Sequence, residues 1–269
     1  MSKLEIANYI IETKKIPQEF NDYVIVQISD LHNKSFGKNN IYLINEIEKI
    51  NPQVVFITGD LIDGENKNFQ VALDLLGNLT QKYKVYYITG NHEQKALVKR
   101  YKELYKQYFK KLHDLSAIHL DNDQIQIKKG NSHINLYGLT IPFECYKYLF
   151  DKNKNTKLYE NFLQESLPLI NRNEYNILLA HTPFYFDEYE KWGADLILTG
   201  HVHGGIIRLP FLGGLLSPNR HFFPEYDLGK YDKKDSTMIV TKGLGGSKVL
   251  VRINCKPEVV KITLKSKHY

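Results

Sequence analysis

The sequence predicts an α/β fold in which two β-sheets pack face to face and carry helices on their outer sides. Short apolar runs rich in Val and Ile recur along the chain and stop at Gly, Asp or His. Segments with apolar residues at helical spacing separate these runs, as in βαβ units. A second cluster of strand-like segments closes the chain. Two strand clusters, each with helices of its own, indicate two sheets rather than one.

Five apolar runs each lead into a side chain that can bind a metal. They span residues 24–29, 54–58, 85–89, 176–180 and 196–198. In this order they lead into Asp30-Leu31-His32, Gly59-Asp60, Gly90-Asn91-His92-Glu93, His181 and Gly200-His201-Val202-His203. Because ligands in open α/β sheets bind at the carboxyl ends of the strands, we expect these side chains to gather in one crevice.

Four helices are expected between the strands, at residues 41–50, 69–79, 97–112 and 158–167. Each segment repeats apolar residues at helical spacing, and Asn51-Pro52 ends the first pattern. Lysines at positions 95, 99, 102, 106 and 110 occupy the other face of the third segment. That face is either the solvated side of an amphipathic helix or a contact for phosphate-bearing partners.

Beyond residue 115, the pattern predicts mainly short strands. Residues 117–120, 125–128 and 133–141 form a meander with turns at Asp121-Asn122 and Gly130-Asn131. Residues 237–242, 248–254 and 258–264 form the closing cluster. The sequence has no internal repeat, low-complexity tract or linker, so residues 1–269 are expected to form a single domain.

Composition fits an enzyme domain. The net charge of +6 suits an anionic substrate or a membrane surface, and a lysine-rich solvated exterior explains it equally well. Cys145 and Cys255 lie far apart without CxxC spacing, which argues against a disulfide framework and favours a reducing compartment. The first twenty residues contain Glu5 and Glu12 and predict neither a signal peptide nor a transmembrane helix. We therefore expect a cytoplasmic protein, with peripheral membrane contact as the alternative.

The collected side chains suit a pair of divalent metal ions. Imidazoles together with carboxylates fit Mn, Fe or Zn better than a calcium cage. Seven protein ligands are too many for one tetrahedral ion that keeps an open position. Two dications balanced by Asp30 and Asp60 leave a net positive centre that can bind phosphate. Such two-metal sites clamp the attacking and leaving oxygens of an in-line displacement.

In type and order, these motifs resemble the calcineurin-like metallophosphoesterase superfamily. The resemblance spans residues 30–203 and comprises DxH, GD, GNHE, a later His and GHxH. It implies a four-layer α/β/β/α sandwich, with two mixed sheets face to face and flanking helices. It also implies that the first metal is bound by Asp30, His32 and His203, that Asp60 bridges, and that the second metal is bound by Asn91, His181 and His201.

The same resemblance gives His92 the catalytic role, away from the metals, as general acid or transition-state donor. An imidazole beside a scissile P–O bond can protonate the leaving oxygen near neutral pH. Asp63 and Glu93 either hydrogen-bond imidazoles and orient them without touching the metals, or are turn and helix-cap residues.

The HGGxIRLP sequence that begins at His203 resembles a bacterial subgroup that includes phosphodiesterases and UDP-2,3-diacylglucosamine pyrophosphatases. Arg208 and Arg220 are either bidentate phosphate clamps or surface ion-pair residues. The apolar stretch Leu209–Leu216 either contacts acyl chains or a bilayer, or forms a buried turn.

These features predict a dinuclear metal-dependent phosphohydrolase that cleaves a phosphodiester or pyrophosphate bond by attack of a metal-bridging hydroxide. Two divalent ions, Mn first and Fe or Zn next, are the expected cofactors, and a phosphate-containing small molecule or lipid, such as a lipid-linked nucleotide, is the expected partner. A phosphomonoesterase or nuclease is the alternative on the same site, although no basic groove with interleaved aromatics favours nucleic acid. A non-catalytic scaffold is a further alternative, but all seven ligand positions and His92 are present.

Overall fold

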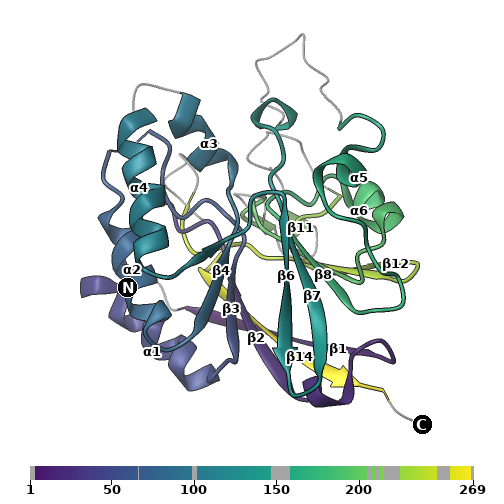
Figure 1. Cartoon of the computed structure of the whole chain (residues 1–269). Coiled ribbons are helices and arrows are strands. Elements are labelled where there is room, and N and C mark those ends of the chain that lie inside the picture. Colours follow the sequence, from purple (N-terminus) through teal and green to yellow (C-terminus); the bar gives the residue numbers. More distant parts are fainter. Residues whose placement is uncertain are drawn as a thin grey trace.

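Two six-stranded β-sheets face each other and carry helices on their outer sides (Figure 1). The computed structural model describes residues 4–65, 67–98, 102–146, 158–204, 225–246 and 255–267, and the backbone alone at 208–209 and 213–214. The first sheet has the order β1 (Glu5–Thr13), β14 (Glu258–Ser266), β2 (Tyr23–Ile28), β3 (Val54–Ile57), β4 (Lys84–Tyr87) and β5 (Ile118–His119). The second has the order β12 (Gly229–Lys233), β13 (Ser236–Val240), β9 (Leu196–Thr199), β8 (Asn176–Ala180), β7 (Ser132–Leu139) and β6 (Asp123–Lys129).

Both sheets are mixed. In the first, β2 to β5 run parallel, β14 runs antiparallel to β2, and β1 runs parallel to β14. In the second, β13, β9, β8 and β7 run parallel, and β12 and β6 add antiparallel edges. The parallel strands of each sheet therefore all end at one border of that sheet. A further short pair, β10 (Arg208–Leu209) and β11 (Gly213–Gly214), is antiparallel.

Three apolar layers fill the spaces between and outside the sheets. Successive side chains of a strand point to opposite faces, so Phe56 of β3 joins the layer between the sheets. The adjacent Val55 joins the layer beneath the helices of the first sheet. Leu198 of β9 enters the middle layer and Ile197 the outer layer of the second sheet. Because both faces are covered, the central strands read as continuous apolar runs.

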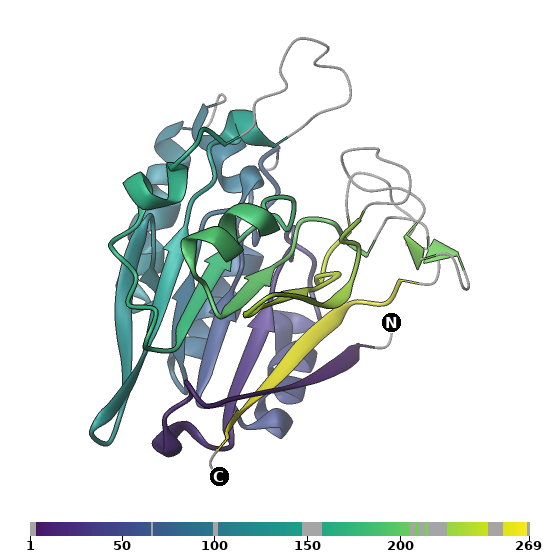
Figure 2. The same ribbon diagram turned by 90° about the vertical axis from the view of Figure 1, so that its right-hand side faces the viewer.

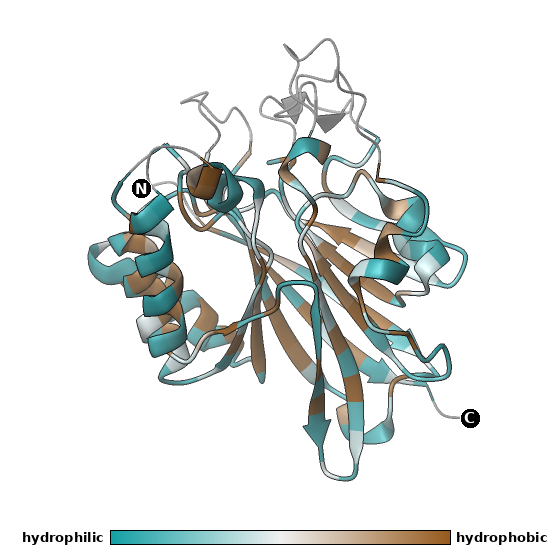
Figure 3. Cartoon of the chain, turned by 45° about the horizontal axis from the view of Figure 1, so that its top comes forward, coloured by the Kyte–Doolittle hydropathy of each residue, from teal (hydrophilic) through white to brown (hydrophobic). Residues whose placement is uncertain are grey.

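The first sheet is covered by α1 (Ile41–Ile50), α2 (Gln70–Thr80), α3 (Asn91–Val98) and α4 (Lys102–Asp114) (Figure 1). The second is covered by α5 (Phe162–Ser166) and α6 (Phe186–Trp192) (Figure 2). Short 3-10 turns are η1 (Gln18–Phe20), η2 (Lys38–Asn40) and η3 (Phe143–Cys145). Figure 3 shows apolar residues concentrated on the strands and polar residues on the outer sides of the helices.

The predicted sandwich of two mixed sheets with flanking helices is confirmed. The helix predicted at 97–112 is wrong in its bounds, because α3 already begins at Asn91 and runs through Val98, and α4 begins at Lys102. The helix predicted at 158–167 is shorter than expected, at Phe162–Ser166. The strand predicted at 248–254 lies outside the described residues. The strands β1 and β12, the short pair β10 and β11, and the helix α6 were not predicted. No helix in the described part of the chain combines the length and the apolar character needed to span a bilayer.

Candidate metal centre

All seven expected ligands lie just after strands that end at the same border of the two sheets. Asp30 follows β2, Asp60 follows β3 and Asn91 follows β4 in the first sheet. His181 follows β8, and His201 and His203 follow β9, in the second sheet. The two sets meet across the sandwich, because Nε2 of His181 lies 3.1 Å from Oδ2 of Asp60 and 3.1 Å from Oδ1 of Asn91.

The donor atoms form small groups, each able to hold a divalent ion. Within the described residues, one group is Asp30, His32 and His203, a second is Asp60, His181 and His201, and a third is His32, Asp60 and His92. The ligand atoms of each group lie within 4.8 Å of one another. In the first, Nε2 of His32 lies 3.3 Å from Nε2 of His203, and each lies within 3.8 Å of Oδ1 of Asp30.

Burial makes this arrangement costly without a cation. The side chains of Asp30 and Asp60 are 0% and 1% exposed, and buried carboxylates are normally paired or bound to metal. Burial raises the pKa of Asp30 to about 6. Burial also lowers the pKa of His32 to about 3, which favours the neutral imidazole that a metal ligand needs. A buried set of N and O donors that converge in this way fits divalent metals.

In the absence of metal, a protonated His181 supplies positive charge beside the two buried carboxylates. Burial alone would lower the pKa of this imidazole, but the carboxylates of Asp60 and Asp30 outweigh burial and raise it to about 10. Its Nδ1 donates to the carbonyl oxygen of Thr58 at 2.6 Å, which fixes the ring with Nε2 toward Asp60. An imidazole held through its other nitrogen is the usual arrangement for a metal ligand.

The backbone turns sharply where the ligands begin. Asp30, His32, Asp60, His201 and His203 all have positive φ, between 46° and 67°. Left-handed backbone is strained for non-glycine residues and clusters at functional sites. Cross-strand hydrogen bonds hold these turns, such as Asp30 N–H to the Gly59 carbonyl at 3.0 Å and His32 N–H to the Asp60 carbonyl at 3.1 Å.

Two glycines allow the loops to approach the carboxylates. A Cβ added at Gly90 would overlap Oδ1 of Asp60, and one added at Gly200 would overlap Oδ2 of Asp30. Gly90, which precedes Asn91, and Gly200, which precedes His201, are therefore required by the close approach of the backbone to these carboxylates.

Glu93 supports the loops rather than an imidazole. Its Oε2 accepts the N–H groups of Asp60 and Gly90, both at 2.9 Å, and its Oε1 accepts the N–H of Ile62 at 3.3 Å. The carboxylate is fully buried, and burial together with the charge of Asp60 raises its pKa to about 7. One side chain thus holds the β3 loop against the start of α3.

His92 lies at the mouth of the centre. Its ring centroid is 4.5 Å from that of His32, and its side chain is 20% exposed. Nδ1 of His92 lies 3.4 Å from Oδ1 of Asp63. Burial lowers the pKa of His92, but the charges of Asp60 and Asp63 outweigh burial and the net pKa is raised. The two carboxylates therefore favour the charged form of this imidazole, and the backbone N–H of Gly64 donates to its Nδ1 at 3.2 Å.

Sequence reasoning missed an aromatic wall beside His201. The ring centroid of Tyr146 lies 5.2 Å from that of His201 and 5.9 Å from that of His181, and Phe184 lies 6.1 Å from His201. Phe184 stands three residues after His181, which is the only signal the sequence offered.

The residues proposed as phosphate clamps cannot be compared with the structure. Arg208 belongs to β10, but its side chain lies outside the description, as do Arg220 and most of Leu209–Leu216. Both interpretations of these residues stay predictions.

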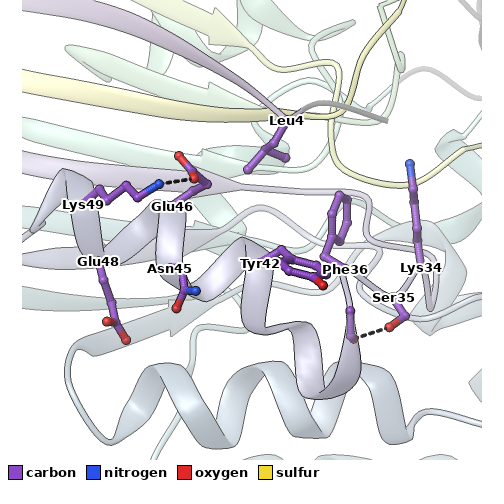
Figure 4. A pocket seen from close by; sticks show the side chains of 10 residues that line it. Leu4, Lys34, Ser35, Phe36, Tyr42, Asn45, Glu46, Glu48 and Lys49 are labelled. Carbon is purple, nitrogen blue, oxygen red and sulfur yellow. Dashed lines mark hydrogen bonds and ion pairs between the residues drawn. The ribbon is translucent and has the colours of Figure 1, made fainter. Parts of the chain in front are cut away.

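A cavity of about 940 Å³ is lined by the loop that follows His32, by α1 and by Leu4 (Figure 4). Leu4, Phe36 and Tyr42 supply its apolar lining, and an ion pair of 2.6 Å between Lys49 and Glu46 lies at its polar end. None of the seven expected ligands lines it, so it is separate from the metal centre.

Fold and site together are those of a metal-dependent phosphoester hydrolase. The family model described as calcineurin-like phosphoesterase matches residues 23–205, and the chain belongs to this family, whose members use divalent metal ions. The matched region contains every residue of the centre.

Relatives and a solved structure agree with this family. The chain is 28% identical over 276 residues to an uncharacterized metallophosphoesterase, YkuE, of Bacillus subtilis, covering 98% of this chain and 86% of the relative. It is 26% identical over 270 residues to a transmembrane protein with metallophosphoesterase domain of Danio rerio, covering 97% of this chain and 57% of that protein. Phosphopantetheinyl hydrolase from Mycobacterium tuberculosis shares the fold with a TM-score of 0.51 at 11% identity, covering 85% of this chain and 92% of that one.

Proposed function

We propose that this chain is a dinuclear phosphohydrolase that cleaves a phosphodiester or pyrophosphate bond. The observation that carries the proposal is the position of the Asp60 carboxylate. Its Oδ1 accepts the backbone N–H of His92 at 2.8 Å. Its Oδ2 lies 3.8 Å from Nε2 of His32 and 3.1 Å from Nε2 of His181. One oxygen of Asp60 therefore faces both groups of ligands, as a bridging carboxylate must.

The proposed ligands divide around Asp60. The first ion would be held by Asp30, His32 and His203, and the second by Asn91, His181 and His201. Mn, Fe and Zn all suit this mixture of nitrogen and oxygen donors. Two such ions would supply a nucleophile at neutral pH and neutralise the phosphoryl charge.

His92 would act on the leaving group. The carboxylates of Asp60 and Asp63 raise the pKa of this imidazole, which lies at the mouth of the centre. Protonation of the leaving oxygen by such a group contributes about 10²–10⁴-fold to rate. Because Oδ1 of Asp60 accepts the backbone N–H of His92, the proposed acid His92 and the proposed bridging ligand Asp60 are held in a fixed relative position.

The preference for a diester or pyrophosphate over a monoester rests on the HGGxIRLP sequence that begins at His203, which resembles a subgroup that includes phosphodiesterases and pyrophosphatases. A lipid-linked nucleotide stays one candidate substrate, with Arg208 and Arg220 as its proposed phosphate contacts.

The test compares bis-p-nitrophenyl phosphate with p-nitrophenyl phosphate on protein stripped of metal and reloaded with Mn²⁺. We expect metal-dependent cleavage that favours the diester. Cleavage of the monoester alone would reject the proposed substrate class and indicate a phosphatase. No cleavage of either substrate by protein that binds two ions would reject a general phosphodiesterase, and turnover of nucleotide diphosphate lipids would then decide.

A further inference from the structure

The strand β1 forms an open edge of the first sheet. In the described part of the chain it pairs only with β14, in a parallel register from Glu5 opposite Glu258 to Thr13 opposite Ser266 (Figure 2). Glu5 N–H donates to the Pro257 carbonyl at 2.9 Å, so the backbone groups of Glu5 face β14. Because successive residues of a parallel strand turn these groups to opposite sides, the backbone groups of Ile6, Asn8 and Ile10 face the open side.

The other three outer strands of the two large sheets are very short or carry lysines, whereas β1 has nine residues and its only charged side chains are Glu5 and Glu12, at or near its ends. β5 has only two residues. β6 carries Lys128 and Lys129 near its end, and β12 carries Lys230 and Lys233. Lysines and short length are the usual devices that keep an edge unpaired. The six residues from position 6 to position 11 of β1 read IANYII, without charge, Pro or Gly.

Apolar surface accompanies this open edge. Ile10 is 66% exposed, although it is an aliphatic residue in the middle of a strand. A neutral window of high β-propensity at an edge is an aggregation hazard unless something pairs with it. Within the monomer, the Asn8 side chain donates to the Ile6 carbonyl at 3.3 Å, which satisfies only one acceptor of the edge.

We propose that β1 pairs antiparallel with β1 of a second copy of this chain across a two-fold axis. With Asn8 opposite Asn8, each Ile10 lies opposite Ile6 of the other copy. Aliphatic cross-strand pairs of this kind stabilise a sheet. Neither acidic residue meets a like charge in this register, because Glu12 falls opposite Leu4 and Glu5 opposite Ile11. Pairing one edge with itself uses both copies of that edge, so the assembly closes as a dimer.

The proposed interface uses no residue of the metal centre, so its failure and the failure of the proposed phosphodiesterase activity are separate results. Sedimentation velocity over a concentration series should show a species of twice the 31.4 kDa chain mass. Ile10→Lys should weaken the dimer by more than about tenfold, because two apolar contacts per dimer are lost. Gln124→Lys on the exposed edge of β6 is the matched control and should leave the dimer unchanged.

Cysteine substitution tests the register. Asn8→Cys should form an intermolecular disulfide under mild oxidation, since directly opposed residues lie about 5.5 Å apart at Cα, within the range of roughly 4.4–6.8 Å that a disulfide needs. Ile10→Cys should not, because the two copies of position 10 lie about 13 Å apart along the strands. The native Cys145 and Cys255 are buried and give little background. A monomer at every concentration, a dimer that Ile10→Lys leaves intact, or crosslinking through position 10 alone would overturn the proposal.

Discussion

Replacing Glu93 by Gln should weaken metal binding without unfolding the chain. The carboxylate accepts three buried backbone N–H groups, from Asp60, Gly90 and Ile62. A carboxamide has a single oxygen. If that oxygen takes the place of Oε2, the new NH₂ group faces the N–H of Ile62, so that one buried donor is left without an acceptor. An unsatisfied buried group costs roughly 1–3 kcal/mol.

The cost falls on the loop that carries the proposed bridging ligand, because Glu93 binds the amide of Asp60 itself. We therefore expect the dissociation constant for Mn²⁺ to rise roughly 10–100-fold, the range typical when an outer partner of a metal ligand is lost. Isothermal titration calorimetry of metal-free protein measures the change, and circular dichroism shows whether the fold is kept. Glu103→Gln makes the same change at an exposed position of α4 and should have no effect. A folded Glu93→Gln protein that binds Mn²⁺ as the parent does would show that Glu93 does not position Asp60 for metal binding.

Three further changes test other parts of the centre. His92→Ala should lower turnover by about 10²–10⁴-fold with both metals retained, and metal analysis beside kinetics distinguishes this from loss of metal, which would contradict the assigned role. Asp60→Asn should lose Mn²⁺, because the shared negative charge between the ions is removed, and an unchanged metal content would argue against a bridge. Mn²⁺ affinity should rise with pH up to about 10, because binding must displace the proton that Asp60 and Asp30 hold on His181. Calorimetry in buffers of different ionisation enthalpy measures this proton release, and affinity that is independent of pH between about 6 and 8 would contradict it.

The sandwich and the convergence of the candidate ligands could be predicted because their signals are local. Each apolar run that is buried on both faces ends at a glycine or a polar residue, and parallel strands bring such ends to one border of a sheet. The strand β1 could not be predicted, because its conformation depends on pairing with β14 near the other end of the chain. The short helix α6 has only seven residues, too few for a helical period to stand out.

The supporting residues of the site depend on contacts that no motif shows. The sequence allowed two roles for Glu93, orienting an imidazole or capping a helix. The structure shows that its carboxylate accepts the backbone amides of two different loops. Tyr146 directly follows η3, far from any motif in the sequence, and contacts His201 only because the fold brings the two segments together.

The most direct test of the account is the number of Mn²⁺ ions per chain that full activity requires. Metal-free protein is titrated with Mn²⁺ while bound metal, turnover of bis-p-nitrophenyl phosphate and the electron paramagnetic resonance spectrum are followed together. We expect turnover to rise until two ions are bound per chain and the spectrum then to show a magnetically coupled pair, as for ions that share the Asp60 carboxylate. Full turnover with one ion per chain, or two ions without coupling, would contradict it.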